Sequence, residues 1–109
     1  MTTLEARNAA LDRAKALVLA GWCQGVFARD ASGMPTRVER KEAVSFCIVG
    51  ATFRATGVKV LTDAPCGDAL KRALVGLGFG ESLARYNDEE GRTKYEVAAI
   101  FDHAKEMPL

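Results

Sequence analysis

Apolar residues recur at helical spacing over three long stretches of the chain. The first stretch follows Thr2 and Glu5, whose spacing is that of a capping box, and it predicts a helix from about Thr3 to Ala20. Gly21 is expected to end this helix in the left-handed conformation that glycine adopts without penalty. The residues expected on the buried face are Leu4, Leu11, Ala14 and Val18, and those expected largely on the other side are Arg7, Asn8, Asp12 and Lys15.

The middle of the chain is ambiguous between helix and strand. Positions 44, 46 and 48 alternate as in a strand, whereas small residues recur at every fourth position from Ala43 to Ala55. The small stripe and the following Gly57 favour a helix from Lys41 to Ala55, on which the other helices would pack. Before it, an extended piece at Val26–Ala28 leads into a loop, and Val58–Leu61 is a candidate strand partner for this piece.

Two more helices are expected in the second half. Thr62–Pro65 resembles a helix start, and apolar residues at positions 70, 73, 74 and 77 form one face before the glycines at 78 and 80. Glu81–Tyr86 is expected to add one helical turn, followed by a polar loop at Asn87–Gly91. Thr93 and Glu96 form a second capping box before a last helix, after which the final residues should fray. Its expected buried face is Val97, Ile100, Phe101 and Ala104.

These elements predict a mainly α fold. We expect one compact domain over residues 1–109, a bundle of about four helices with a loop or small β-hairpin between the first two. A chain of 109 residues with 49% hydrophobic residues can bury one modest core.

Charge and composition exclude several partners. The formal net charge is +1, so no overall field attracts nucleic acid or an anionic membrane. A basic cluster at Arg37, Arg40 and Lys41 is interrupted by Glu39 and Glu42. No apolar run approaches the ~20 residues that span a bilayer, and the first residues do not resemble a signal peptide. Three cysteines, an odd number, then favour reduced thiols and a cytoplasmic location.

The candidate chemical groups do not form a recognisable catalytic or metal site. Cys23, Cys47, Cys66 and His103 lack the paired spacing of a zinc site, so packing is the favoured role of the thiols. Cys66 lies near a predicted helix start, where the helix dipole lowers a thiol pKa, but nothing places a base beside it. The acidic residues at 88–90 are typical of a solvated loop. We therefore predict no catalytic residue, no metal and no cofactor.

A recognition surface remains as the best candidate site. Trp, Tyr and Arg are the residues most enriched at interface hot spots. An equally weighted alternative is that Trp22 and Tyr86 fasten loops to the core. The candidate residues are Trp22, Gln24, Arg29 and Asp30 after the first helix, and Tyr86, Asn87, Asp88 and Arg92 before the last.

Three segments in the same order resemble a small uncharacterised family found in bacteria and their phages. They are Gly21–Asp30, Phe46–Ala51 and Tyr86–Thr93, which are similar to the family's W-C/T-Q-G-x-x-A-R-D, aromatic-C-x-x-G-A and N-D…G-R-T patterns. Phe46 stands where the family pattern has Trp. The resemblance implies one all-helical domain in which these segments matter, and it carries no established activity.

Three functions follow as hypotheses. The first is a small cytoplasmic protein-binding or accessory module, with a phage or mobile-element role as one form of it. The second is a small ligand-binding domain or enzyme that uses Cys23 or Cys66 with Gln24 and Arg92. The third and weakest is nucleic-acid binding through the cluster at positions 37–41. The sequence defines neither a partner's identity nor an oligomeric state.

Overall fold

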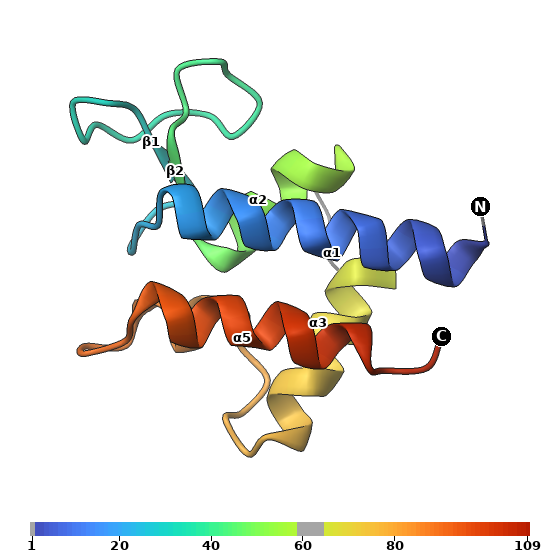
Figure 1. Ribbon diagram of the computed structural model, residues 1–109. Helices are drawn as coiled ribbons and strands as arrows, with labels where there is room; N and C mark the ends of the chain where they lie inside the picture. The colour runs from blue at the N-terminus through green and yellow to red at the C-terminus, as the bar shows by residue number, and fades with distance from the viewer. Residues whose placement is uncertain (1, 59–64) are drawn as a thin grey trace.

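The computed structural model describes residues 2–58 and 65–109. In this part the chain forms five helices and one two-stranded hairpin (Figure 1). The mainly α fold with a small hairpin before the second helix is confirmed. The elements are α1 (Thr3–Ala20), β1 (Ala28–Arg29), β2 (Ser45–Phe46), α2 (Ile48–Thr56), α3 (Pro65–Gly76), α4 (Leu83–Asp88) and α5 (Lys94–Lys105).

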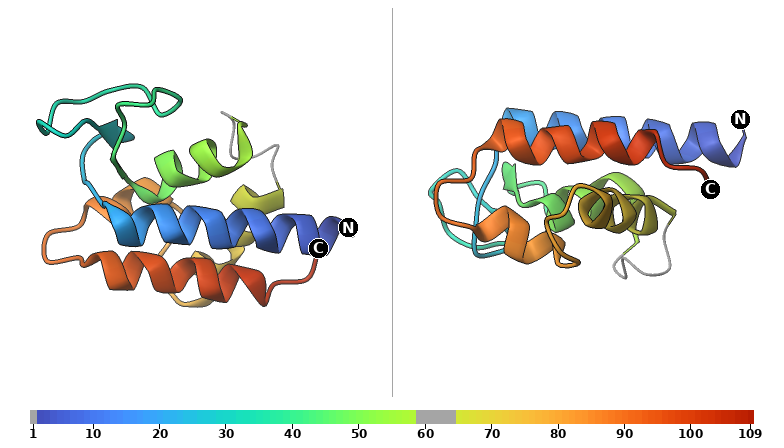
Figure 2. Two further views of the ribbon diagram at one scale, coloured as in Figure 1. Left: turned by 45° about the horizontal axis from the view of Figure 1, so that its top comes forward. Right: turned by 90° about the horizontal axis from the view of Figure 1, so that it is seen from below.

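The helices form two layers. The first and last helices, α1 and α5, lie side by side and antiparallel, with both chain ends at the same end of the pair (Figure 1). The other helices cover one side of this pair, with α2 against α1 and α3 against α5 (Figure 2). The expectation that all helices pack on the second helix is therefore wrong. With nine residues, α2 is too short to serve as the axis of the fold.

The core confirms most of the predicted helical faces. Leu4 and Leu77 are the exceptions, with 41% and 39% of their surfaces exposed near helix ends. Fully buried side chains come from both layers, so one continuous core joins them. The largest apolar ones are Phe101, Leu11, Ile48, Leu70, Leu74, Ile100, Val18 and Val97.

Helices α1 and α5 begin where their caps predict. The Thr2 hydroxyl accepts a hydrogen bond from the Glu5 amide at 3.0 Å. At α5 the capping box is complete, since Thr93 accepts from the Glu96 amide and the Glu96 carboxylate accepts from the Thr93 amide. Pro65 opens α3 as expected, while residues 62–64 of that predicted helix start lie outside the described residues.

The predicted helix from Lys41 to Ala55 is wrong in its first half. Residues 41–44 form a loop, Ser45–Phe46 is a strand, and only then does α2 begin. The alternation at positions 44–48 was thus the correct pattern for this part. The strand pairs antiparallel with β1, Ala28 opposite Phe46 and Arg29 opposite Ser45. The described partner of Ala28 is thus Phe46. The predicted pairing of Val26–Ala28 with Val58–Leu61 is not tested, because residues 59–61 lie outside the described residues.

Two glycines let the hairpin approach the helices closely. Gly21 has φ −167°, an extended conformation and not the predicted left-handed one. A Cβ at Gly21 would collide with the carbonyl oxygen of Val44, and one at Gly50 would collide with that of Phe27. At Gly21 the two backbones are also joined by a hydrogen bond, in which the Phe46 amide donates to the Gly21 carbonyl at 2.9 Å. Glycine is needed at both positions because two backbones meet there.

Two further expectations fail near the chain ends. Arg7, predicted to lie away from the core, is 3% exposed. Its guanidinium donates to the carbonyls of Lys105 and Met107 at 3.2 and 2.6 Å and to that of Pro108 at 3.5 Å. Met107 and Pro108, expected to fray, are therefore hydrogen-bonded to the core, because an arginine offers five donors to carbonyls left over at a helix end.

Candidate functional site

A buried amide joins the corner after α1 to the end of α4. The helix α4 continues to Asp88, two residues beyond the predicted turn, so Asn87 is helical and fully buried. Its Oδ1 accepts from the Trp22 indole at 2.8 Å and the Ile48 amide at 3.0 Å. Its Nδ2 donates to the Cys23 carbonyl at 3.1 Å and the Asp88 carboxylate at 2.9 Å. The hydrogen-bonding capacity of this side chain is thus fully used.

Gln24 and Asp88 extend this connection on the solvent side. The Gln24 amide nitrogen donates to the carbonyls of Asn87 and Glu89 at 3.0 and 3.1 Å, which are groups that the end of α4 leaves without helical partners. The Gly25 amide donates to Asp88 Oδ1 at 2.9 Å. We call Trp22, Gln24, Asn87 and Asp88 the corner network. It fixes residues 22–25 against the end of α4.

Arg92 and Tyr86 form a second, adjoining cluster. The Arg92 guanidinium lies 3.7 Å from the centre of the Tyr86 ring and donates to the Tyr86 carbonyl at 2.9 Å. It also pairs with Glu89 at 2.8 Å and with Glu96 at 3.1 Å, and only 11% of its side chain is exposed. Arg92 therefore ties the loop before α5 to both helices that flank it.

Arg29 and Asp30 shape the loop of the hairpin. Arg29 donates to the carbonyls of Gly33 and Gln24 at 2.9 and 3.1 Å. The Asp30 carboxylate accepts from the Ser32 amide, the Ser32 hydroxyl and the Met34 amide, and these bonds lower the pKa of Asp30. Seven of the eight predicted site residues are thus linked in space, and Asp30 supports a turn beside them. That these residues bind a partner stays a prediction.

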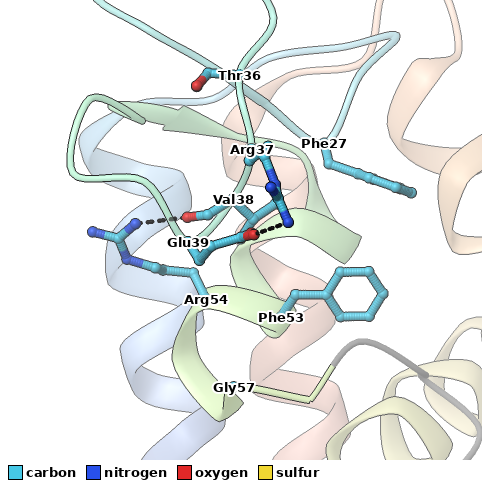
Figure 3. Close-up of a pocket in the computed structure, with 8 residues that line it drawn as sticks. All are labelled: Phe27, Thr36, Arg37, Val38, Glu39, Phe53, Arg54 and Gly57. Atoms are coloured by element: carbon cyan, nitrogen blue, oxygen red, sulfur yellow. Dashed lines mark hydrogen bonds and ion pairs between the residues drawn. The ribbon is translucent and has the colours of Figure 1, made fainter.

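A half-exposed phenylalanine marks a groove that the sequence analysis missed. Phe27 precedes β1 and is 53% exposed. Its ring packs edge-on against Phe53 of α2, with 5.7 Å between the ring centres (Figure 3). Beside these rings lies a groove of about 520 Å³, which we call the Phe27 groove. Its lining residues are Phe27, Thr36, Arg37, Val38, Glu39, Phe53, Arg54 and Gly57.

The wall of the Phe27 groove opposite α2 is held by an arginine. Arg54 donates to the carbonyls of Val38 and Arg40 at 2.6 and 2.8 Å, and it also lies over the Phe46 ring. Figure 3 shows the bond from Arg54 to Val38. Arg37 and Glu39 pair across the rim at 2.9 Å. The groove is therefore formed in the free chain, because its loop wall is tied to the helix that carries Phe53.

A second hollow adjoins the other side of Phe27 and connects the groove to the corner network. It measures about 430 Å³ and is lined by Gly25, Val26, Phe27, Thr36, Cys47, Ala84 and Asp88. Phe27 and Thr36 belong to both hollows, so the two are neighbours along one surface. The signal available in the sequence was an apolar pair, Val26–Phe27, inside a segment whose helical pattern had lapsed.

The family of the chain follows from comparison with known proteins. Residues 2–107 match a family of unknown function. The chain belongs to DUF6197. No curated protein and no solved structure matches this DUF6197 member. The match confirms that the family is uncharacterised, whereas its three sequence patterns and its occurrence in bacteria and phages stay predictions.

The thiols of this DUF6197 member are poorly suited to nucleophilic chemistry. Cys23, Cys47 and Cys66 are all buried. Burial raises the pKa of all three thiols, that of Cys47 to about 11. The lowered pKa expected for Cys66 at a helix start is therefore wrong, because desolvation outweighs the helix dipole and the nearby arginines.

Two further features bear on the class of this DUF6197 member. Among residues 2–58 and 65–109, no group of three His, Cys, Asp or Glu side chains is arranged to hold a metal ion. No helix in the same ranges has the length and apolar character needed to cross a membrane.

Proposed function

We propose that this chain is a small protein-binding module that receives a segment of another protein in the Phe27 groove. The observation that carries the proposal is the half-exposed Phe27 ring between two neighbouring hollows. An aromatic side chain on a concave, preformed surface is the usual anchor of a binding hot spot. A ligand side chain packed on this ring would remove its apolar surface from water.

The backbone of Phe27 is held as firmly as a binding anchor requires. The Cys47 amide donates to the Phe27 carbonyl at 3.2 Å, and the close approach of Gly50 brings α2 against the same carbonyl. On the other side, the Gly25 amide is fixed by Asp88. A rigid anchor supports affinity because little conformational entropy is lost when the partner binds.

The corner network supports this proposal in a positioning role. Hydrogen bonds within the chain engage three of its side chains, those of Trp22, Gln24 and Asn87. The fourth, Asp88, lines the second hollow. In this proposal the predicted site residues orient the surface, and Asp88 lies where a partner contacts it. We include in the proposal a cytoplasmic location and the phage or mobile-element accessory role that the family resemblance suggested.

The two alternative functions have less support. Buried thiols with raised pKa values give little thiolate at neutral pH, which weighs against a cysteine enzyme. At the basic cluster, Arg37 pairs with Glu39, and Glu42 follows Lys41. The opposing charges weaken attraction of a phosphate backbone.

A selection from random peptides tests the proposal. Peptides displayed on yeast are selected for binding to the immobilised chain. The affinity of each isolated peptide for the chain is then measured by fluorescence anisotropy. Phe27→Ser should weaken binding about tenfold or more, as expected for an anchor. Met34→Ser is the matched control, because Met34 is 62% exposed and lines neither hollow. A failure to select any peptide, or peptides that bind Phe27→Ser equally well, would overturn the proposal.

A further inference from the structure

We infer that the segment bound in the Phe27 groove carries a basic side chain that pairs with Asp88, next to the apolar side chain that packs on Phe27. The inference rests on the proposed function and specifies the chemistry of the ligand. It follows from the charge of the second hollow, whose described lining holds a single charged side chain, that of Asp88.

Asp88 is a fixed acidic group with remaining capacity to bind. Its Oδ1 accepts from the Gly25 amide and from Asn87 Nδ2, each at 2.9 Å. These two donors are neutral, and within residues 2–58 and 65–109 no lysine or arginine forms an ion pair with Asp88. The residue is exposed at the end of α4 and lines the hollow beside Phe27. A ligand cation can therefore reach this carboxylate.

Several charged side chains near the Phe27 groove and at the end of α4 are already engaged within the chain. Arg37 pairs with Glu39, and Arg54 is used to hold two loop carbonyls. Glu89, the next residue after Asp88, pairs with Arg92. In the second hollow, by contrast, Asp88 is the one charged side chain of the described lining, so an incoming basic group would meet a carboxylate without an opposing cation in that lining. Charge complementarity thus favours a lysine or arginine in the ligand.

The position of Asp88 also fixes where the basic residue must lie. Asp88 and Phe27 line the same hollow, so one short extended segment can contact both. The Asp88 carboxylate is already oriented by its two hydrogen bonds. Binding of a basic group therefore costs less conformational entropy, because the carboxylate does not have to reorganise. Arg85 lines a different hollow, which Asp88 also lines and Phe27 does not.

The peptides selected above provide the test. We expect them to be enriched in an aromatic or aliphatic residue with a lysine or arginine close to it. For one such peptide, replacing its basic residue by glutamine should weaken binding to the wild-type chain about tenfold. The same replacement should have little effect on binding to Asp88→Asn, which keeps the Oδ1 acceptor but loses the charge. Glu90→Gln is the control, since it removes one exposed negative charge two residues away.

The outcomes separate this inference from the proposed function. Peptides that depend on Phe27 but show no basic enrichment, and that bind Asp88→Asn as tightly as wild type, would overturn the inference alone. The absence of any Phe27-dependent peptide would overturn both. Because the glutamine peptide is measured on the unmodified chain, the inference remains testable even if Asp88→Asn folds poorly.

Discussion

At the scale of single residues, Asn87 illustrates how a predicted surface residue can have an internal role. A solvated asparagine in a polar loop and a buried asparagine that bonds four partners look alike in a sequence. The difference arises because Trp22 and Ile48, far from it along the chain, direct two donors at the same oxygen. Removing the Asn87 side chain would leave buried donors unpaired. The free-energy cost of an unpaired buried donor exceeds the net stabilisation that its hydrogen bond provides.

Gly50 gives a prediction whose sign opposes helix propensity. In most helices, replacing glycine by alanine stabilises the protein by about 0.5–1 kcal/mol. A Cβ at Gly50 would instead collide with the backbone of Phe27, so Gly50→Ala should lower the free energy of unfolding by about 1–3 kcal/mol. Urea unfolding measures this change.

The control for Gly50 lies in another helix. Gly76 is the last residue of α3, and a Cβ there would meet no described atom within 4 Å. Gly76→Ala should therefore be neutral or slightly stabilising. If Gly50→Ala were as stable as Gly76→Ala, the close contact between α2 and the segment that carries Phe27 would not exist.

At the scale of elements, the sequence predicts the helices whose ends carry conventional caps. Thr2 and Thr93 place the starts of α1 and α5 correctly. The start of α2 was misplaced because its cap is Cys47, whose sulfur accepts from the Gly50 amide at 3.2 Å. Cysteine is not among the preferred capping residues, so the sequence carries no start signal at residue 47, and the stripe of small residues extends the predicted helix back to Lys41.

The candidate site was only partly predictable for a related reason. Trp22 and Tyr86 stood out by residue type, and the structure brings their segments together. Phe27 was marked only by the apolar pair Val26–Phe27, because its exposure depends on how the hairpin meets α2 and not on local spacing. The groove itself depends on Arg54 reaching two loop carbonyls, a contact between elements that no periodicity encodes.

Cys47 predicts a specific loss of stability at alkaline pH. Burial raises its pKa from the ordinary 9.0 to about 11. In the unfolded chain the thiol ionises near pH 9, whereas in the folded chain it keeps its proton until about pH 11. The unfolded state therefore loses its proton first, and the stability present below pH 9 should fall as the pH rises towards 11.

Cys47→Ser isolates this contribution from the other groups that ionise at high pH. A serine hydroxyl keeps the capping acceptor for α2 and does not ionise in this range. Between pH 9 and 11 the free energy of unfolding should fall less steeply for Cys47→Ser than for wild type, as measured by urea unfolding at each pH. Parallel curves for the two proteins would contradict a buried, protonated thiol at this position.

At the scale of the whole molecule, the two ends of the chain are fastened to one another. Two ion pairs join the outer faces of α1 and α5, between Lys15 and Asp102 at 3.0 Å and between Asp12 and Lys105 at 2.8 Å. Both pairs are partly exposed and contribute little. The contact of the buried Arg7 with the last carbonyls is different. It gives hydrogen-bond acceptors to a desolvated guanidinium and a donor to the carbonyls at the end of α5.

This arrangement predicts coupling between Arg7 and the last residues. Deleting residues 106–109 should destabilise the fold by about 2–4 kcal/mol, because it leaves the Arg7 cation without the carbonyls of residues 107 and 108. Arg7→Met alone should cost less, since the carbonyls it frees lie near the surface and can bind water. The deletion should cost much less in the Arg7→Met background than in wild type, because no buried cation then remains to be satisfied.

Arg72→Met is the control for this double-mutant cycle of Arg7→Met and the deletion. Arg72 also donates to the Pro108 carbonyl, at 2.5 Å, but 38% of its side chain is exposed and it pairs with Asp68. Water can replace its contact, so its coupling to the deletion should be small. Equal coupling for Arg7 and Arg72 in urea unfolding would mean that burial of the Arg7 cation adds nothing. A large coupling for Arg7 alone would show that the terminal residues are held because a charge in the core requires them.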